Sequence, residues 1–307
     1  EAVAVSRREP TAGLTAPWPP WLSAETVARI ERSGVPAPWK HQVEFAQALF
    51  DGRHAIVCTP TGSGKTLGYL MPVIAATAEG TLGVAVDSTR ARLTGPRHTA
   101  LYLAPTKALA HDQARAAAAL GPKGWRLTAL DGDSDDAGRR FARDHADLVL
   151  TNPDMLHFSV LPNHQRWASF LGSLRYIVLD EAHRYQGVFG AHVAQVIRRL
   201  RRLAAQYGAD PVVALSSATA PNAGEFAGLL IGAEDVAAFR HDSSPSGRRT
   251  AVLWQPASSL RADTAELLAG IAPPPAPPRG ARLDVDAPQE AVERALEKVR
   301  TENKVAV

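Results

Sequence analysis

The segment TPTGSGKT, Thr59 to Thr66, constrains this chain more than any other feature of its sequence. It directly follows the apolar run HAIVC and directly precedes a helical pattern. Glycines at this spacing let backbone N–H groups curl around phosphate oxygens, and the N-terminus of the helix adds positive potential. The sequence therefore predicts a P-loop fold with a bound nucleotide. The expected nucleotide-binding residues are Thr61, Gly62, Ser63, Gly64, Lys65 and Thr66.

Two residues of this loop have more specific expected roles. Lys65 is expected to reach the β and γ phosphates and to act in catalysis, and the hydroxyl of Thr66 is expected to bind Mg²⁺. Thr59 stands where the strict pattern has glycine. We expect its side chain to face away from the phosphates.

Short apolar runs alternate with helical stretches from His54 onward. The runs are HAIVC, TALYLA, WRLTAL, ADLVL, RYIVLD and DPVVALSS, and helix candidates include Thr66 to Ala78, Ala108 to Leu120 and Ala191 to Gln206. Apolar runs bounded by turn residues are typical of buried parallel strands. The repeat predicts an α/β fold, a doubly wound parallel sheet flanked by helices, with ligands at the carboxyl ends of its strands.

The segment LDEAH, Leu179 to His183, closes the run RYIVLD. Asp180 is expected to hold Mg²⁺, usually through water, and Glu181 to orient and deprotonate the water that attacks a γ-phosphate. The expected ligands are therefore ATP and Mg²⁺. His183 is placed to sense the γ-phosphate, and the segment SSAT, Ser216 to Thr219, supplies hydroxyls that could bond the carboxylates or His183. We assign this coupling to His183, Ser217 and Thr219; a helix cap is the alternative for the hydroxyls.

The composition excludes some classes of protein and of site but does not by itself indicate a function. The 34 basic residues comprise 28 Arg and 6 Lys, for a formal charge of +3. Arginine suits phosphate contact, but a biased genomic base composition explains the excess equally well. The single cysteine, Cys58, excludes an internal disulfide and predicts no zinc site in this chain. No apolar run reaches the roughly 18 residues of a membrane span, so we expect a cytoplasmic protein without a membrane partner. The sequence begins with Glu, which leaves trimming open.

The motifs in their order along the chain resemble those of superfamily-two helicases. GSGKT, APTKALA, TNPDM, DEAH and SAT are similar to motifs I, Ia, Ib, II and III. The longer segments LTNPDMLHFSVLP, YIVLDEAHRYQGVFGAHVAQVIRRLRRL and SSATAPNAGEFAGLLIG resemble the MrfA-type DEAH helicases, bacterial relatives of the fungal RecQ-four-like DNA repair helicases. The resemblance covers about His41 to Gly232. It implies a RecA-like fold and ATP-driven 3′ to 5′ movement on DNA in repair, with an RNA helicase as the alternative.

The resemblance also implies roles for residues outside the loop. Gln42 resembles the glutamine that reads the adenine edge in related helicases, and Trp39 could stack on the base. Residues after two predicted strands are expected to contact the phosphates of single-stranded or partly duplex DNA. They are Thr106, Lys107, Thr151, Asn152 and Asp154. Helix capping by Thr and Asn is the competing explanation. The run Ile197 to Leu203 predicts first an amphipathic helix with a solvated arginine face.

Three segments are expected along the chain. Residues 1–38 lead into the domain, residues 39–235 form a RecA-like ATP-binding domain, and residues 236–307 start or connect to a second domain. No QxxGRxGR-like motif of a second RecA-like domain occurs, so such a domain is expected to be required in cis. Pro273 to Pro278 predicts a stiff linker and Gln289 to Lys304 a charged helix. A DNA helicase and a nucleotide-gated DNA-binding module without turnover both remain open.

Overall fold

A seven-stranded sheet lies at the centre of the structure, and every strand pair in it is parallel. The computed structural model describes residues 2–80, 98–220 and 222–254. The strand order is β4-β5-β3-β6-β7-β2-β8. The strands are β2 (Ala55–Cys58), β3 (Thr99–Leu103), β4 (Leu127–Ala129), β5 (Leu148–Thr151), β6 (Leu174–Leu179), β7 (Val212–Ser217) and β8 (Ala237–Phe239). The predicted α/β fold with a doubly wound parallel sheet is confirmed.

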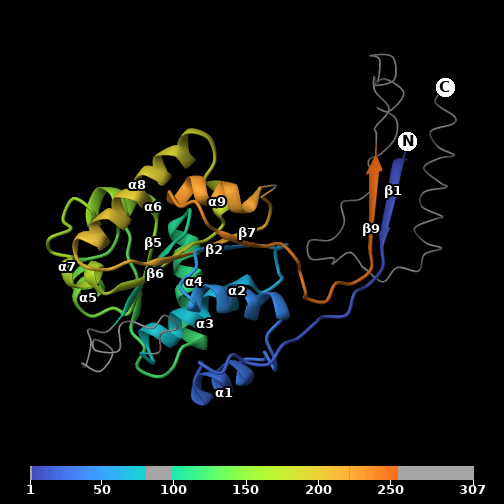
Figure 1. The fold of residues 1–307 in the computed structure, drawn as a ribbon, viewed down its shortest axis with the longest axis horizontal. Coiled ribbons are helices and arrows are strands. Elements are labelled where there is room, and N and C mark those ends of the chain that lie inside the picture. Colours follow the sequence, from blue (N-terminus) through green and yellow to red (C-terminus); the bar gives the residue numbers. More distant parts are fainter. Residues whose placement is uncertain (1, 81–97, 221, 255–307) are drawn as a thin grey trace, which may run out of the picture. The chain divides into compact units, whose positions relative to one another are not determined.

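Helices cover both faces of this sheet, with α8 and α9 on one face and α2 and α3 on the other (Figure 1). The longer helices are α1 (Ala24–Arg32), α2 (Lys40–Phe50), α3 (Lys65–Thr77), α4 (Lys107–Leu120), α5 (Asp136–Asp144), α8 (Gly187–Gln206) and α9 (Ala223–Ile231). Shorter elements are α6 (Pro153–Met155), the π-helix η1 (Leu156–Val160), α7 (Ala168–Gly172) and the 3₁₀ helix η2 (Ala182–Arg184). The predicted helices that fall within the described residues are present, although α8 begins at Gly187, earlier than the predicted Ala191.

Strand β6 shows why the apolar runs fold this way. Its successive side chains point to opposite faces of the sheet. Tyr176 and Val178 pack into the core under α2, α3 and α4, whereas Ile177 and Leu179 pack into the core under α8 and α9. Because both faces are covered, both sets of positions are apolar. Each fully buried large side chain contributes about 1.5–3 kcal/mol of hydrophobic stabilisation.

The N-terminal segment packs onto the same body through α1, whose bounds match the amphipathic stretch predicted at Ala24 to Arg32. Ser23 caps this helix by accepting a hydrogen bond from the backbone N–H of Thr26 at 3.2 Å. Ile30 is fully buried, and it packs in one cluster with Met71 of α3. The helix α1, which precedes position 39, therefore contributes to the core of this body.

The chain divides into two compact units, Gly13–Ser244 and a second unit formed by Glu1–Ala12 with Pro245–Val307. In the described part of the second unit, β1 (Ala2–Arg8) and β9 (Arg249–Trp254) pair antiparallel. These bounds differ from the predicted 39–235, because α1 and β8 both belong to the larger unit. The predicted linker at Pro273 to Pro278 and the predicted helix at Gln289 to Lys304 lie outside the described residues.

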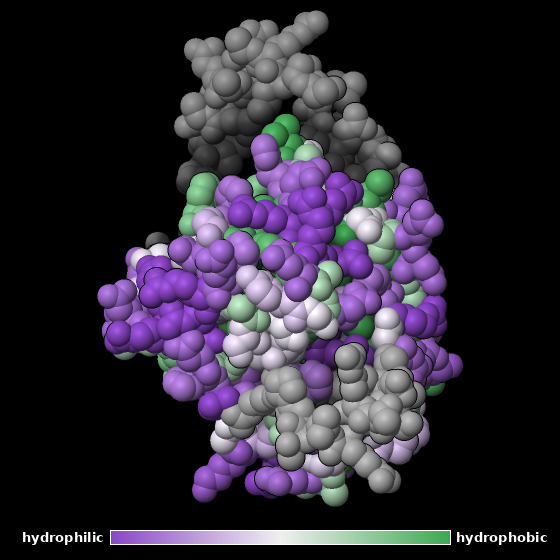
Figure 2. All heavy atoms as spheres, turned by 60° about the vertical axis from the view of Figure 1, so that its left-hand side comes forward, coloured by the Kyte–Doolittle hydropathy of each residue, from purple (hydrophilic) through white to green (hydrophobic). Residues whose placement is uncertain are grey.

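The face of the molecule drawn in Figure 2 is mainly polar. Figure 2 shows one face, on which hydrophilic residues predominate and apolar residues form small separate areas. Among residues 2–80, 98–220 and 222–254, no helix combines the length and apolar character that a membrane span needs.

Candidate active site

The glycine-rich loop joins β2 to α3, as predicted, at the carboxyl edge of the sheet. Gly62 and Gly64 have φ values of +88° and +79°, a region that favours glycine. Gly64 is also held closely, because a Cβ on it would lie 2.4 Å from Nε2 of Gln42. Both backbone conformation and space therefore require glycine at position 64.

Gln42 ties the first turn of α2 to this loop. Its Nε2 donates a hydrogen bond to the carbonyl oxygen of Gly64 at 2.8 Å, and its Oε1 accepts one from the backbone N–H of Trp39 at 2.8 Å. The side chain is buried. One amide N–H remains for another acceptor. Reading of adenine by Gln42 and stacking by Trp39 stay predictions.

Lys65 lies folded onto the loop. Its Nζ donates to the carbonyl oxygens of Thr59 at 2.8 Å and Pro60 at 3.0 Å. Burial lowers the pKa of Lys65, while the charges of Glu181 and Asp180 raise it. The ammonium group therefore lies within the field of the acidic pair that follows β6.

The remaining loop hydroxyls differ in exposure. Thr59 is fully buried, with its Oγ1 2.7 Å from Oγ of Ser63. Thr66 is half-buried in the first turn of α3, and Thr61 is exposed. The hydroxyl of Thr59 thus bonds within the loop, in keeping with a side chain that faces away from a bound phosphate.

Asp180 is fixed from both sides by neighbouring strands. The hydroxyl of Tyr102 in β3 donates to its Oδ2, and the hydroxyl of Ser216 in β7 donates to its Oδ1. Strands β3 and β7 flank β6. Hydrogen bonds from the two neighbouring strands therefore fix the orientation of the carboxylate. Oδ1 also accepts a hydrogen bond from the backbone N–H of Glu181 at 3.0 Å, whereas Oδ2 keeps a second lone pair. Oxygen donors are those that Mg²⁺ prefers, with several waters retained. The donor set at Asp180 and Thr66 therefore fits a magnesium ion.

Tyr102 and Tyr69 were not predicted as part of the site. Their rings lie 6.0 Å apart between centroids, and both side chains are buried. Burial raises the pKa of both phenols, so Tyr102 remains a neutral donor to Asp180. The one available signal in the sequence is a tyrosine inside the otherwise apolar run TALYL, which needs a partner for its buried hydroxyl.

Glu181 is the one non-glycine residue with positive φ in the described part of the chain, at +49°. Such strain is retained where surrounding structure imposes it. His183 Nδ1 lies 3.3 Å from Oε2 of Glu181 and 3.5 Å from Oγ of Ser217. The backbone N–H of Thr219 donates to the same Oγ at 3.3 Å, and its side chain is exposed. The structure therefore brings the predicted coupling residues His183 and Ser217 together with the acidic pair, whereas Thr219 joins through its backbone.

The predicted nucleic-acid residues also lie at the carboxyl edge, and two of them cap helices. Thr106 Oγ1 accepts from the backbone N–H of Leu109 at 3.4 Å, and Asn152 Oδ1 accepts from that of Met155 at 2.8 Å. Capping is therefore present, and contact with phosphates stays a prediction.

The other three predicted residues differ in accessibility. Lys107 is exposed, and its Nζ lies 2.7 Å from Oδ2 of Asp133. Asp154 is exposed in the first turn of α6. Thr151 is buried and donates its hydroxyl to the carbonyl oxygen of Leu130 at 2.6 Å. The side chain of Thr151 thus bonds within the sheet rather than at the surface.

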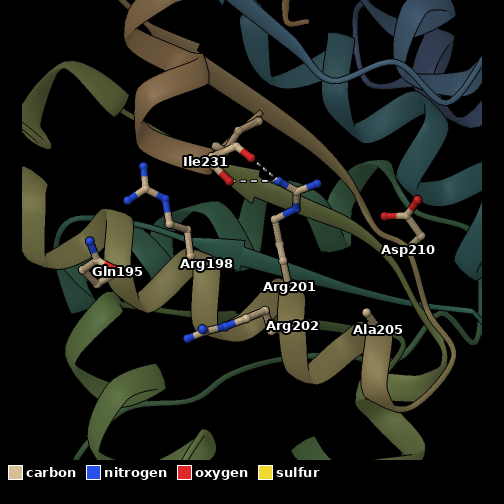
Figure 3. Close-up of a pocket in the computed structure, with 8 residues that line it drawn as sticks. Gln195, Arg198, Arg201, Arg202, Ala205, Asp210 and Ile231 are labelled. Atoms are coloured by element: carbon tan, nitrogen blue, oxygen red, sulfur yellow. Dashed lines mark hydrogen bonds between the residues drawn. The ribbon is translucent and has the colours of Figure 1, made fainter. Parts of the chain in front are cut away.

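Three arginines of α8, Arg198, Arg201 and Arg202, line a separate pocket of about 430 Å³ beside the end of α9 (Figure 3). A guanidinium nitrogen of Arg198 donates to the carbonyl oxygen of Leu229 at 2.9 Å, and one of Arg201 donates to that of Ile231 at 2.9 Å. These carbonyls belong to the last turn of α9, where intrahelical donors run out. The predicted amphipathic helix is confirmed, and part of its arginine face serves as a helix cap.

Comparisons with known proteins match the part of the chain that contains this candidate site. The sequence pattern of the DEAD/DEAH box helicase family matches residues 39–226. The ATP-dependent helicase YprA of Bacillus subtilis, described as uncharacterized, is 38% identical over 251 residues, which is 81% of this chain and 31% of YprA. The ATP-dependent helicase hrq1 of Schizosaccharomyces pombe is 35% identical over 76% of this chain and 21% of its own length.

Solved structures give the same relationship. The DUF1998 helicase MrfA bound to DNA superposes with a TM-score of 0.75 at 36% identity, covering 87% of this chain and 37% of that chain. A second structure of MrfA, bound to DNA and AMPPNP, gives 0.74 at 37% identity. The chain therefore spans between 21% and 37% of the length of these relatives.

Proposed function

The chain belongs to the DEAD/DEAH box helicase family, and from that premise we propose that it is the ATP-binding, RecA-like part of an ATP-dependent DNA helicase of the MrfA type. Movement from 3′ to 5′ and a role in DNA repair are part of this proposal through the family resemblance. The observation that carries it is the carboxylate of Asp180, which Tyr102 and Ser216 fix at the edge of the sheet where the phosphate loop lies.

Each residue of the site has a distinct task in this proposal. ATP with Mg²⁺ supplies the scissile phosphate bond and the divalent charge that shields it. Lys65 exchanges its two loop carbonyls for phosphate oxygens, and Asp180 and Thr66 hold the metal side of the site. Glu181 orients a water molecule and accepts its proton. His183 and Ser217 connect this carboxylate to β7, so that nucleotide state can reach the rest of the domain.

DNA is favoured over RNA by the more similar relatives. MrfA, at 36–37% identity, is described as bound to DNA. The DEAD-box helicase Mss116 bound to single-stranded RNA shares 21% identity, which supports the fold alone. The DEAD-box ATP-dependent RNA helicase 22 of Arabidopsis thaliana is 27% identical over 59% of this chain. An RNA helicase is therefore an outcome that the experiment must separate.

Turnover requires more positive charge than the described site supplies. Lys65 is the one cation that the described loop brings to the phosphates, and further cations are worth about 10³–10⁵ in rate in related phosphoryl-transfer systems. Two candidates on α8, Arg198 and Arg201, are engaged with α9. We propose that the longer protein, with a second RecA-like domain in cis, provides the missing arginines, and that the 307-residue chain hydrolyses ATP very slowly.

Phosphate release is the test, measured with this chain and with a longer form of the protein, each without nucleic acid, with single-stranded DNA and with single-stranded RNA. We expect DNA-stimulated hydrolysis and strand unwinding from the longer form alone. Glu181→Gln should abolish hydrolysis while a fluorescent ATP analogue still binds, and Lys65→Ala should abolish binding. Glu225→Gln, an exposed change on α9, is the matched control.

The other outcomes each exclude part of the proposal. Stronger stimulation by RNA would favour the RNA helicase, and nucleotide binding without turnover in the longer form would favour a nucleotide-gated DNA-binding module. Rapid hydrolysis by the 307-residue chain would mean either that self-association supplies an arginine, with Arg199 and Arg202 the first to test, or that residues after Gly270 supply a catalytic element. Equal analogue binding by wild type and Lys65→Ala would exclude the assigned pocket.

A further inference from the structure

Two covalent connections lead out of the unit Gly13–Ser244, and both run past the first turn of α2. The backbone N–H of Leu14 donates to the carbonyl oxygen of Ser243 at 2.8 Å. The N–H of Lys40 in turn donates to the carbonyl oxygen of Leu14 at 2.8 Å. Residues near the beginning and the end of this unit are thus bonded to each other and to α2.

His41 is the centre of this junction. It is 2% exposed, and Ser243 is 3% exposed. The backbone N–H of His41 donates to Oγ of Ser243 at 2.9 Å, and the backbone N–H of Ser243 donates to Nδ1 of His41 at 3.2 Å. Nδ1 and Oγ also lie 2.8 Å apart. Several polar contacts in a dry environment therefore hold the end of the unit against α2.

The other ring nitrogen of His41 is not used by this junction. Because the N–H of Ser243 donates to Nδ1, the neutral ring carries its proton on Nε2. Nε2 is buried, and it has no hydrogen-bond partner among the described residues. An unsatisfied buried donor costs about 1–3 kcal/mol. Contact with Ser243 alone does not account for a histidine here, since a side chain without this donor would avoid that cost.

The phosphate loop is the neighbour whose backbone and charge act on this ring. Burial lowers the pKa of His41, Asp242 and the backbone of Ser63 raise it, and the charges of Lys65 and His241 lower it. Ser63 and Lys65 belong to the loop. The next residue in α2, Gln42, donates to the loop carbonyl of Gly64. The first turn of α2 therefore contacts the phosphate loop through Gln42 and the end of the unit through His41.

We propose that His41 is a positioning residue that couples the phosphate loop to the two chain connections at Gly13 and Ser244. The inference rests on the proposed function, in that the loop binds ATP. Nucleotide binding takes Lys65 away from the carbonyl oxygens of Thr59 and Pro60. The loop then rearranges, Nε2 of His41 donates to it, and the ring shifts against Ser243. Nucleotide state thereby reaches the segment through which the chain leaves the unit.

The experiment compares hydrogen exchange at the backbone amides of Leu14 and Ser243 with and without a non-hydrolysable ATP analogue in the full chain. In the wild type the analogue should change exchange at both amides at least threefold. Ser243→Ala, which removes the hydroxyl that contacts His41, should still bind the analogue but lose this response. Ser244→Ala is the matched control, because its hydroxyl donates to Asp242 and not to α2; it should respond like the wild type.

Two substitutions of His41 separate positioning from packing. Asn retains an acceptor near Nδ1 but has no group in place of Nε2, whereas the amide of Gln reaches that place and can donate. His41→Gln should therefore keep the exchange response that His41→Asn loses, whatever their melting temperatures. An unchanged response in Ser243→Ala and His41→Asn, with analogue bound, would overturn this inference alone. Failure of the wild type to bind the analogue would overturn the proposed function and this inference with it.

Discussion

The hydroxyl of Tyr102 in β3 donates a hydrogen bond to Oδ2 of Asp180, the residue that follows the neighbouring strand β6. Tyr102 lies in none of the segments that resemble helicase motifs. It nevertheless fixes one oxygen of the carboxylate assigned to magnesium, while Ser216 fixes the other. The orientation of this carboxylate is therefore a property of three adjacent strands.

Replacement of Tyr102 by Phe should weaken magnesium-dependent nucleotide binding. The change removes a charge-assisted hydrogen bond but keeps the ring, so we expect affinity for the Mg²⁺-bound ATP analogue to fall about tenfold, in line with about 1.5–3 kcal/mol for a hydrogen bond to a charged group. Titration of the analogue at several Mg²⁺ concentrations measures this. Tyr176→Phe is the control, because its buried hydroxyl contacts the carbonyl oxygen of Leu49 instead. Equal loss in both variants would assign the effect to packing.

Local patterns were sufficient to predict the family and the parallel sheet, and both predictions are confirmed. Apolar runs such as RYIVLD form strands because both faces of the sheet are covered, and the positive φ of Gly64 is a local requirement for glycine in the loop before Thr66. The bonds of Tyr102 and Ser216 to Asp180 depend instead on the order β3-β6-β7. Strand order is set by the whole fold, so the sequence indicated the hydroxyls of the SSAT segment as partners for the carboxylates but did not indicate Tyr102.

The unit's boundaries were harder to predict for the same reason. Strand β8 is three residues long and too short for a periodic signal, yet it pairs with β2. Strands β1 and β9 pair although they are separated by more than 200 residues in sequence. Capping residues such as Thr106 and Asn152 have local signals, but whether they also contact phosphates depends on a ligand.

Gln42 offers a test of two roles that one side chain could fill. If it only holds the loop through Gly64, Gln42→Ala should lower the affinities for ATP and GTP analogues by the same factor, about fivefold or more. If it also reads adenine, as predicted, the affinity for the ATP analogue should fall by a larger factor than the affinity for the GTP analogue. The preference for ATP over GTP should then become smaller. Competition titrations with both nucleotides measure the ratio. Gln47→Ala, on the same helix and bonded to Trp21, should leave both affinities unchanged.

Stability should increase with pH through the range in which the buried His41 and the half-buried His54 and His98 titrate. Burial is the largest cause of the lowered pKa values of His41, His54 and His98. Between these lowered values and the usual value near 6.5, the unfolded chain binds more protons than the folded chain, so folding stability is lost as pH falls below about 6.5. Each histidine adds at most about 1.4 kcal/mol per pH unit to the pH dependence of the unfolding free energy.

Urea unfolding from pH 5 to pH 8 measures this dependence. His54→Asn should reduce the slope below pH 6.5, although it also weakens the bond that His54 Nδ1 accepts from the backbone N–H of Val213 at 3.1 Å. His192→Asn, an exposed change on α8, is the matched control for replacement of a histidine at the surface. A stability that falls as pH rises from 5 to 6.5 would contradict the assignment.

DNA binding should respond in opposite directions to the two members of the Lys107–Asp133 pair. The hydrogen bond to Asp133 raises the pKa of Lys107, and both side chains are exposed, so Asp133 competes with phosphate for the ammonium group. Lys107→Ala should weaken binding of single-stranded DNA to the same extent for every sequence and reduce the slope of log affinity against log salt by about 0.7. Asp133→Asn should strengthen binding.

Lys123→Ala, exposed beyond the opposite end of α4, is the control for both variants. Fluorescence anisotropy at several salt concentrations measures the DNA affinity of all three. A strong sequence preference, or a salt slope that Lys107→Ala leaves unchanged, would show that this edge of the sheet does not contact the DNA backbone.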